Sequence, residues 1–218
     1  PRLMERLRVL FVGCSLTYSN DMPAIVRDLA QAAGEKLEVV QATRGGASLA
    51  DHWKHGGALR EIKAGGWDVV VLQQGPSSTP ENRQNLRQWA RRFAEPIRKA
   101  GARPALYMVW PTLDRFAFFD QVRDSYRLAA EDVDGMLFPA GEAWRAVLRR
   151  DPKVALYKRD GLHPSPAGSL TVALSIFGIL YGRSPVGLPA RAFAKVSPAL
   201  TPLLQEAAAE ANEQFGKR

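Results

Sequence analysis

Short runs of apolar, largely β-branched residues alternate with longer amphipathic segments, and this alternation constrains the fold more than any other feature of the chain. Five runs are candidate strands, at residues 8–13, 36–42, 67–73, 103–110 and 135–140. Helices are predicted near residues 22–33, 80–100, 114–131, 142–150, 166–181 and 197–214. Continuous apolar runs are typical of strands buried on both faces. The pattern therefore predicts an α/β fold, a parallel sheet with helices on both sides.

Breaks in the pattern are few, and they mark the ends of elements rather than the ends of domains. Gly34 and Gly101 follow predicted helices, and Pro80 stands where another helix begins. No internal repeat, low-complexity tract or Pro/Gly-rich linker divides the 218 residues. A surface loop is predicted at residues 182–193, before a tail helix that we expect to be exposed and available for contacts. We expect one domain over residues 1–218.

Composition excludes some classes of protein. The net charge is +8, but Lys and Arg are scattered and form no basic block, so nucleic-acid binding is not expected. No run of about 18 apolar residues is present, so no membrane span is expected. The single cysteine, Cys14, excludes an intramolecular disulfide and is interpreted as a small buried residue. The start at Pro1 leaves the compartment open between cytoplasm and export after removal of an upstream signal peptide.

Polar residues follow each predicted strand, where parallel sheets bind their ligands. The segments are GCSLT, TRGGAS, QQGPSS and WP, and a further segment, DGLHPSPAG, lies near the other end of the chain. Ser15 stands two residues after the first strand, and a serine hydroxyl needs a base to become a nucleophile. His163 is a candidate base, because Pro164 keeps it out of helical conformation and Asp160 stands three residues earlier. Ser165 and Pro166 have the pattern of a helix start.

The other two histidines, His52 and His55, are spaced so that they could share one helix face as metal ligands. No third ligand stands nearby in the sequence, so we expect no metal, and interpret the pair as a helix surface feature with Trp53 packing inward. An acyl-transfer site also needs donors for an oxyanion. Candidates are the backbone N–H of Ser15, the backbone at Gly46, and a side-chain amide of Gln73 or Gln74.

Other residues near these segments have two interpretations each. Thr17 and Asn20 are candidates to brace the serine turn by hydrogen bonds to the backbone. Tyr18, Trp110 and Phe116 are candidates to line an acyl or alcohol pocket, although core packing is the favoured interpretation.

These motifs carry a resemblance to a known superfamily. FVGCSLTYSND resembles the nucleophile block of the SGNH, or GDSL-like, hydrolases, GGAS resembles their second block, and DGLHPSPAG resembles the last. The resemblance implies a three-layer α/β/α sandwich with a five-stranded parallel, flavodoxin-like sheet. It also implies Ser15 as nucleophile, His163 as general base and Asp160 as the residue that orients it, with Gly46 as an oxyanion donor.

The chain departs from the superfamily in the third block. That block usually carries Gly-x-Asn, with the asparagine in the oxyanion hole, whereas this chain has QQGPSS. Gln74 is the first candidate to replace the asparagine, Gln73 the second and Ser77 the third. Adjacent residues of a strand point to opposite faces, so only one of the glutamines is expected to face the site.

The sequence therefore predicts a serine esterase that hydrolyses small acyl esters, acetyl esters first among them, and that needs no cofactor. Carbohydrate esters are among the candidate substrates. An acyltransferase or thioesterase on the same scaffold and a non-catalytic ligand-binding module are the alternatives. A nucleotide-binding protein is disfavoured, because the first turn lacks the P-loop and G-x-G-x-x-G patterns. The acyl and alcohol specificity and the oligomeric state are not determined by these motifs.

Overall fold

The computed structural model describes residues 6–189 and 195–218, and five strands form one sheet in that part of the chain. All strand pairs are parallel, and the order is β2-β1-β3-β4-β5. The strands are β1 (Leu7–Gly13), β2 (Leu37–Thr43), β3 (Val69–Leu72), β4 (Arg103–Tyr107) and β5 (Met136–Phe138). The predicted α/β/α fold with a five-stranded, flavodoxin-like parallel sheet is confirmed.

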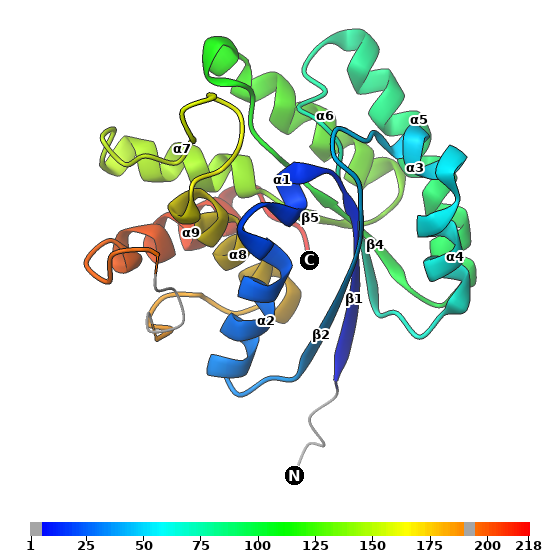
Figure 1. Cartoon of the computed structure of the whole chain (residues 1–218), viewed down its shortest axis with the longest axis horizontal. Helices are drawn as coiled ribbons and strands as arrows, with labels where there is room; N and C mark the ends of the chain where they lie inside the picture. Colours follow the sequence, from blue (N-terminus) through cyan, green and yellow to red (C-terminus); the bar gives the residue numbers. More distant parts are fainter. Residues whose placement is uncertain (1–5, 190–194) are drawn as a thin grey trace.

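Helices cover both faces of this sheet (Figure 1). One layer contains α2 (Met22–Ala32), α7 (Ala140–Arg150), α8 (Pro166–Tyr181) and α9 (Thr201–Phe215). The other contains α3 (Leu49–His55), α4 (Gly57–Ala64), α5 (Pro80–Lys99) and α6 (Phe119–Asp132). The short α1 (Ser15–Tyr18) and the 3-10 segments η1 (Ser19–Asp21) and η2 (Leu113–Phe118) lie among the loops that follow the strands.

Three short helices, α1, α3 and α4, were not among the predicted helix ranges, although His52 and His55 of α3 were interpreted as part of a helix, and one helix begins later than predicted. Helices α3 and α4 have seven and eight residues, too few for a clear amphipathic repeat. A local signal was nevertheless present, because Ser48 and Asp51 form a capping box at the start of α3. The helix predicted from residue 114 begins at Phe119, since η2 precedes it with a kink at Arg115.

The tail helix is not exposed, so that expectation is wrong. Helix α9 packs against α7 and α8, and Leu204, Ala207, Ala208 and Ala211 are buried. The Ser175 hydroxyl of α8 donates a hydrogen bond to Asn212 Oδ1 of α9, at 2.7 Å. Because α8 is apolar on all sides, it needs a cover on the face that the sheet does not reach, and α9 provides it.

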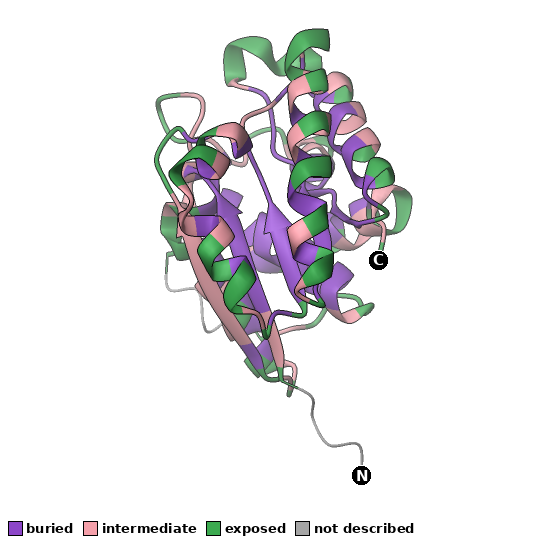
Figure 2. Ribbon diagram, turned by 90° about the vertical axis from the view of Figure 1, so that its right-hand side faces the viewer, coloured by how far each residue is buried: buried purple, intermediate pink, exposed green. Residues whose placement is uncertain are grey.

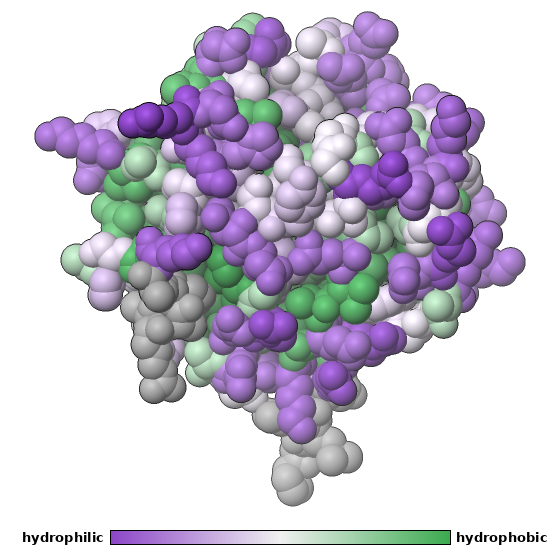
Figure 3. All heavy atoms as spheres, in the orientation of Figure 1, coloured by the Kyte–Doolittle hydropathy of each residue, from purple (hydrophilic) through white to green (hydrophobic). Residues whose placement is uncertain are grey.

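The buried apolar residues form one continuous cluster around the sheet. Figure 2 shows the interior strands buried and the outer faces of the helices exposed. On the face drawn in Figure 3, hydrophobic residues appear as patches between hydrophilic ones. In the described segments, no helix combines the length and apolar character that crossing a bilayer requires. The loop predicted at residues 182–193 is described as far as residue 189, and its remaining residues lie outside the described part.

Candidate active site

The turn after β1 is held by hydrogen bonds to the side chain of Gln73, which follows the neighbouring strand β3. Gln73 Oε1 accepts hydrogen bonds from the Cys14 N–H at 2.9 Å and from the Thr17 hydroxyl at 2.6 Å. A Cβ at Gly13 would lie 2.3 Å from that oxygen and 2.5 Å from Thr17 Oγ1. Only glycine fits at this position, so the close approach of Gln73 accounts for the residue that ends β1.

A second support of this turn is His52, which was interpreted from the sequence as a surface residue. That interpretation is wrong for His52, which is buried, while His55 is exposed. His52 Nε2 donates a hydrogen bond to the Gly13 carbonyl oxygen at 2.8 Å. Burial lowers the pKa of the imidazole, which favours its neutral form. Within the described ranges, no three His, Cys, Asp or Glu side chains are grouped to hold a metal ion.

The structure brings together Ser15, His163 and Asp160 from distant parts of the chain. Ser15 Oγ lies 2.9 Å from His163 Nε2, and His163 Nδ1 lies 2.5 Å from Asp160 Oδ2. With the carboxylate as acceptor, Nδ1 carries the proton and Nε2 is free to accept the hydroxyl proton of Ser15. The three groups therefore form one hydrogen-bonded chain from hydroxyl to carboxylate.

Asp160 is held in this position by its own loop. Its Oδ1 accepts the backbone N–H groups of Leu162 at 3.0 Å and His163 at 2.9 Å. The hydrogen bond from His163, followed by these two N–H groups, lowers the pKa of the Asp160 carboxyl to about 2. Asp160 is consequently ionised under all ordinary conditions, and one oxygen remains for the imidazole.

The loop that presents His163 is tied to the rest of the sheet edge. Asn20 donates to the carbonyl oxygens of Pro164 and Ser165 and to the Ser169 hydroxyl, at 2.8–3.2 Å. Trp110 Nε1 donates to the Leu162 carbonyl at 2.9 Å. The expectation that Asn20 braces the serine turn through backbone groups is confirmed, and its partners belong to the histidine loop. The predicted cap is also present, since Ser165 Oγ accepts the Gly168 N–H at the start of α8.

Ser15 opens on a cavity of about 350 Å³ that Gly46 and Gln74 also line. The backbone N–H groups of Ser15 and Gly46 have no acceptor within hydrogen-bonding distance among the residues that the structure describes. Gly46 has a φ of +69°, a conformation that favours glycine. Two unpaired backbone donors that line one cavity with the Ser15 hydroxyl are the kind of group that stabilises an oxyanion.

The Gln74 side-chain amide, which also lines this cavity, belongs to a hydrogen-bond network. Gln74 Oε1 accepts the Leu49 N–H at 3.0 Å, which determines the orientation of the amide. Its Nε2 consequently donates to Ser77 Oγ at 3.1 Å and to Asn85 Oδ1 at 3.3 Å. Asn85, from α5, lines the same cavity, and in the described part of the chain its Nδ2 has no partner. Asn85 escaped the sequence analysis because no motif places a helix residue at this edge.

Ser77, the third candidate, also lines this cavity, but its hydroxyl donates to the Gly75 carbonyl at 3.1 Å. Four other sequence candidates do not line the cavity. Gln73 is fully buried under the turn, where its Nε2 donates to Cys14 Sγ and to the Gln74 carbonyl. Trp110 is buried and stacks on Trp144 with ring centroids 3.7 Å apart, as the favoured core interpretation predicted. Tyr18 and Phe116 are exposed and lie outside this cavity. Of the two glutamines, therefore, only Gln74 faces the site.

Comparisons with known proteins find similar solved structures but no matching family model. No family model matches the chain, and no curated protein matches it. A protein from Slackia heliotrinireducens described as a proposed SGNH hydrolase is 29% identical over 81% of this chain and 100% of its own, with a TM-score of 0.66. A DUF4886 family protein from Bacteroides uniformis ATCC 8492 is 20% identical over 95% of each chain, with a TM-score of 0.80. An acetyl xylan esterase is 18% identical over 79% of this chain and 98% of its own, with a TM-score of 0.63.

Proposed function

We propose that the chain is a serine esterase of the SGNH hydrolase superfamily, with Ser15 as nucleophile, His163 as general base and Asp160 as the group that orients the imidazole. The likeness in fold to a protein described as an SGNH hydrolase supports this proposal. The observation that carries this proposal is the continuous chain of two hydrogen bonds, 2.9 Å and 2.5 Å long, from Ser15 Oγ through His163 to Asp160. A serine without such a base is a poor nucleophile, and an imidazole without such a partner can take the wrong tautomer.

The first half of the reaction forms an acyl-enzyme. Ser15 Oγ bonds to the ester carbonyl carbon as its proton passes to His163 Nε2. The carbonyl oxygen becomes an oxyanion beside the N–H groups of Ser15 and Gly46. The bond to the alcohol oxygen then breaks, and His163 Nε2 returns its proton to the leaving alcohol. The acyl group remains on Ser15.

The second half releases the acid. His163 Nε2 takes a proton from water as the water oxygen bonds to the acyl carbon. The bond to Ser15 Oγ breaks, and the proton returns to that oxygen. The products are the free acid and an enzyme with its starting protonation states, so every step uses groups of the chain and a water molecule.

The third oxyanion donor is proposed to be the Asn85 amide rather than that of Gln74. Both N–H groups of Gln74 already have acceptors in Ser77 and Asn85, whereas the Nδ2 group of Asn85 remains available in the described part of the structure. Gln74 then acts by holding Asn85, since its Nε2 fixes the Asn85 carbonyl oxygen and so directs the free nitrogen.

Replacement of Asn85 tests this assignment. Asn85→Asp keeps an acceptor for Gln74 but removes the donor and adds a negative charge, so kcat should fall about 10²-fold or more with a smaller change in KM. Asn82→Asp is the matched control, because Asn82 lines the same cavity at an exposed position of the same helix. Steady-state kinetics on p-nitrophenyl acetate measure both. Equal kcat values for the Asn85 and Asn82 variants would contradict the role of Asn85.

The size and lining of the cavity favour a small acyl group. Its volume of about 350 Å³ is at the lower end for ligand sites, and polar groups of Ser48, Gln74, Ser77 and Asn85 stand on its wall. An acetyl ester of a polyhydroxylated alcohol such as a carbohydrate fits this polarity. The fold shared with an acetyl xylan esterase is compatible with such a substrate.

Active-site labelling combined with a chain-length series tests the function as a whole. A fluorophosphonate should modify Ser15 alone, as peptide mapping would show, and kcat/KM should be higher for p-nitrophenyl acetate than for p-nitrophenyl octanoate. Faster turnover of the octanoate or of an acyl thioester would favour the thioesterase alternative. Labelling of another residue, or binding of carbohydrate acetates without turnover, would overturn the esterase proposal.

A further inference from the structure

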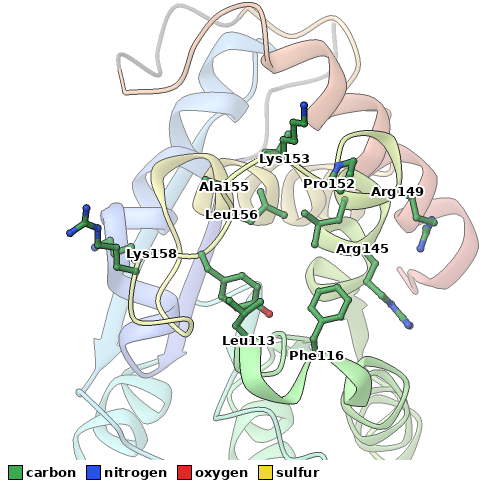
Figure 4. A pocket seen from close by; sticks show the side chains of 13 residues that line it. Leu113, Phe116, Arg145, Arg149, Pro152, Lys153, Ala155, Leu156 and Lys158 are labelled. Atoms are coloured by element: carbon green, nitrogen blue, oxygen red, sulfur yellow. The ribbon is translucent and has the colours of Figure 1, made fainter.

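A second, larger cavity of about 830 Å³ lies apart from Ser15. Its walls come from η2, the second half of α7 and the segment of residues 152–159 that leads to the histidine loop. In Figure 4, Leu113, Phe116 and Leu156 lie at the centre of the lining residues, while the charged ends of Arg149, Lys153 and Lys158 extend outward around them. The cavity is thus apolar inside and cationic at the rim.

The charged residues that line the cavity are all positively charged. Five of the lining residues are Arg or Lys, and none is Asp or Glu. Arg145 pairs with Asp120 and the buried Glu142, and Arg149 lies 3.9 Å from Glu210. In the part of the chain that the structure describes, Lys153, Lys158 and Arg159 have no carboxylate within ion-pair distance. Three exposed cations are therefore free to meet an anion.

Two large apolar side chains that line the cavity are exposed to solvent. Leu113 is 54% exposed and Phe116 is 41% exposed, and both line the cavity. Covering apolar surface stabilises a complex by about 25 cal/mol for each Å² removed from water. A ligand with an apolar body would therefore gain from this surface, and an anionic end would gain from the rim.

This cavity and the smaller one lie on different sides of the histidine loop. Tyr157 and Lys158 line the larger cavity, whereas Leu162 lines the cavity of Ser15. The Lys158 N–H donates to the His163 carbonyl at 2.8 Å, and the Tyr157 hydroxyl donates to the Pro111 carbonyl at 2.6 Å. A molecule in the larger cavity would touch the segment that pairs with His163 without occupying the reaction site.

We propose that the larger cavity binds a soluble amphipathic anion, a carboxylate attached to a single aliphatic chain, for which octanoate is the probe. The volume is within the range of small-molecule sites. The concave shape suits a single chain, and the complementarity of charge selects a carboxylate over a neutral alcohol. The proposal is independent of ester hydrolysis, because it uses none of the residues that line the cavity of Ser15.

Calorimetric titration of the whole protein with octanoate, octanol and acetate tests the ligand class. Octanoate should bind at least about tenfold more tightly than octanol, acetate should not bind, and added salt should weaken octanoate. Binding of octanol as tight as that of octanoate would overturn the proposal. Binding to anionic phospholipid vesicles without binding to octanoate would indicate a membrane surface instead and would equally overturn it.

Variants and methyl NMR test the location. Lys158→Glu with Arg159→Glu should weaken octanoate at least about tenfold. Lys63→Glu with Lys99→Glu is the control, since it changes the net charge equally at exposed positions outside the cavity. Octanoate should shift the methyl signals of Leu113 and Leu156 but not those of Leu162. Equal affinity of the two double variants, or shifts confined to Leu162, would contradict the site.

Discussion

Replacement of Ser15 by alanine is expected to lower kcat/KM for p-nitrophenyl acetate by at least about 10³-fold, because it removes the oxygen that we propose forms the acyl-enzyme. The hydroxyl lies 2.9 Å from His163 Nε2 and is part-buried at the cavity wall. The loss of one part-buried hydroxyl should shift the melting temperature by only a few degrees. Steady-state kinetics and thermal denaturation of the purified variant measure the two effects.

Ser19→Ala is the matched control for this experiment. Ser19 lies four residues further along, in η1, and its hydroxyl makes no hydrogen bond to another described residue. This variant should keep near-normal turnover. If Ser15→Ala retained activity within about tenfold of the unchanged protein, Ser15 would not be the nucleophile.

Replacement of Asp160 by asparagine is expected to lower kcat by about 10³–10⁴-fold through the tautomer of His163. Asp160 Oδ1 accepts two backbone N–H groups, so an asparagine would keep its oxygen there and turn its NH₂ group toward His163 Nδ1. Nδ1 would then have to accept, and the ring proton would move to Nε2. An Nε2–H group cannot take the proton of Ser15, so the base would be lost while the loop kept its shape.

Two measurements separate this mechanism from a loss of structure. The ¹⁵N chemical shifts of His163 should show the proton on Nδ1 in the unchanged protein and on Nε2 in Asp160→Asn. Asp151→Asn is the control, because Asp151 also accepts a backbone N–H in the same connection, from Lys153, but touches no histidine. Unchanged kcat in Asp160→Asn, or loss without a change of tautomer, would contradict the orienting role.

The pH dependence follows from the same geometry. The folded-state pKa of Asp160 is lowered from 3.8 to about 2, so its stabilising hydrogen bonds persist above pH 4 and are lost as the pH falls through 2. The Asp160 carboxyl should accordingly add no ionisation of its own to the pH profile of kcat/KM above pH 4. A slope of 2 above pH 4 would show that the carboxylate also titrates there.

Sequence patterns were sufficient for the sheet but not for every helix. The five strands are apolar runs whose neighbours on both faces are helices, and such runs are visible without tertiary information. Helices α3 and α4 are short, and their pattern is weak because only two residues in each are buried. The burial of α9 depends on α7 and α8, which no local pattern of residues 197–214 could indicate.

In the candidate site, too, some residues were indicated by sequence motifs and others only by the tertiary structure. Ser15, Asp160 and His163 were indicated by short motifs, because local spacing sets the elbow and the Asp-to-His turn. His52 and Gln73 contact the serine turn from segments that lie 39 and 59 residues away in the sequence. Asn85 lies on a helix that lines the cavity. No spacing rule in the sequence indicates any of these three contacts.

The amino-acid sequence by itself determined the class of fold and the positions of the strands, since these depend on periodicity. It also indicated the three residues of the proposed triad, through one motif around Ser15 and a second that holds Asp160 and His163. Tertiary structure decided which glutamine faces the cavity, which amide keeps a free N–H, and where a cationic rim encloses apolar surface. The physical reason is that hydrogen-bond satisfaction and cavity shape are properties of side chains brought together from distant segments, as Ser15 and His163 are across 148 positions.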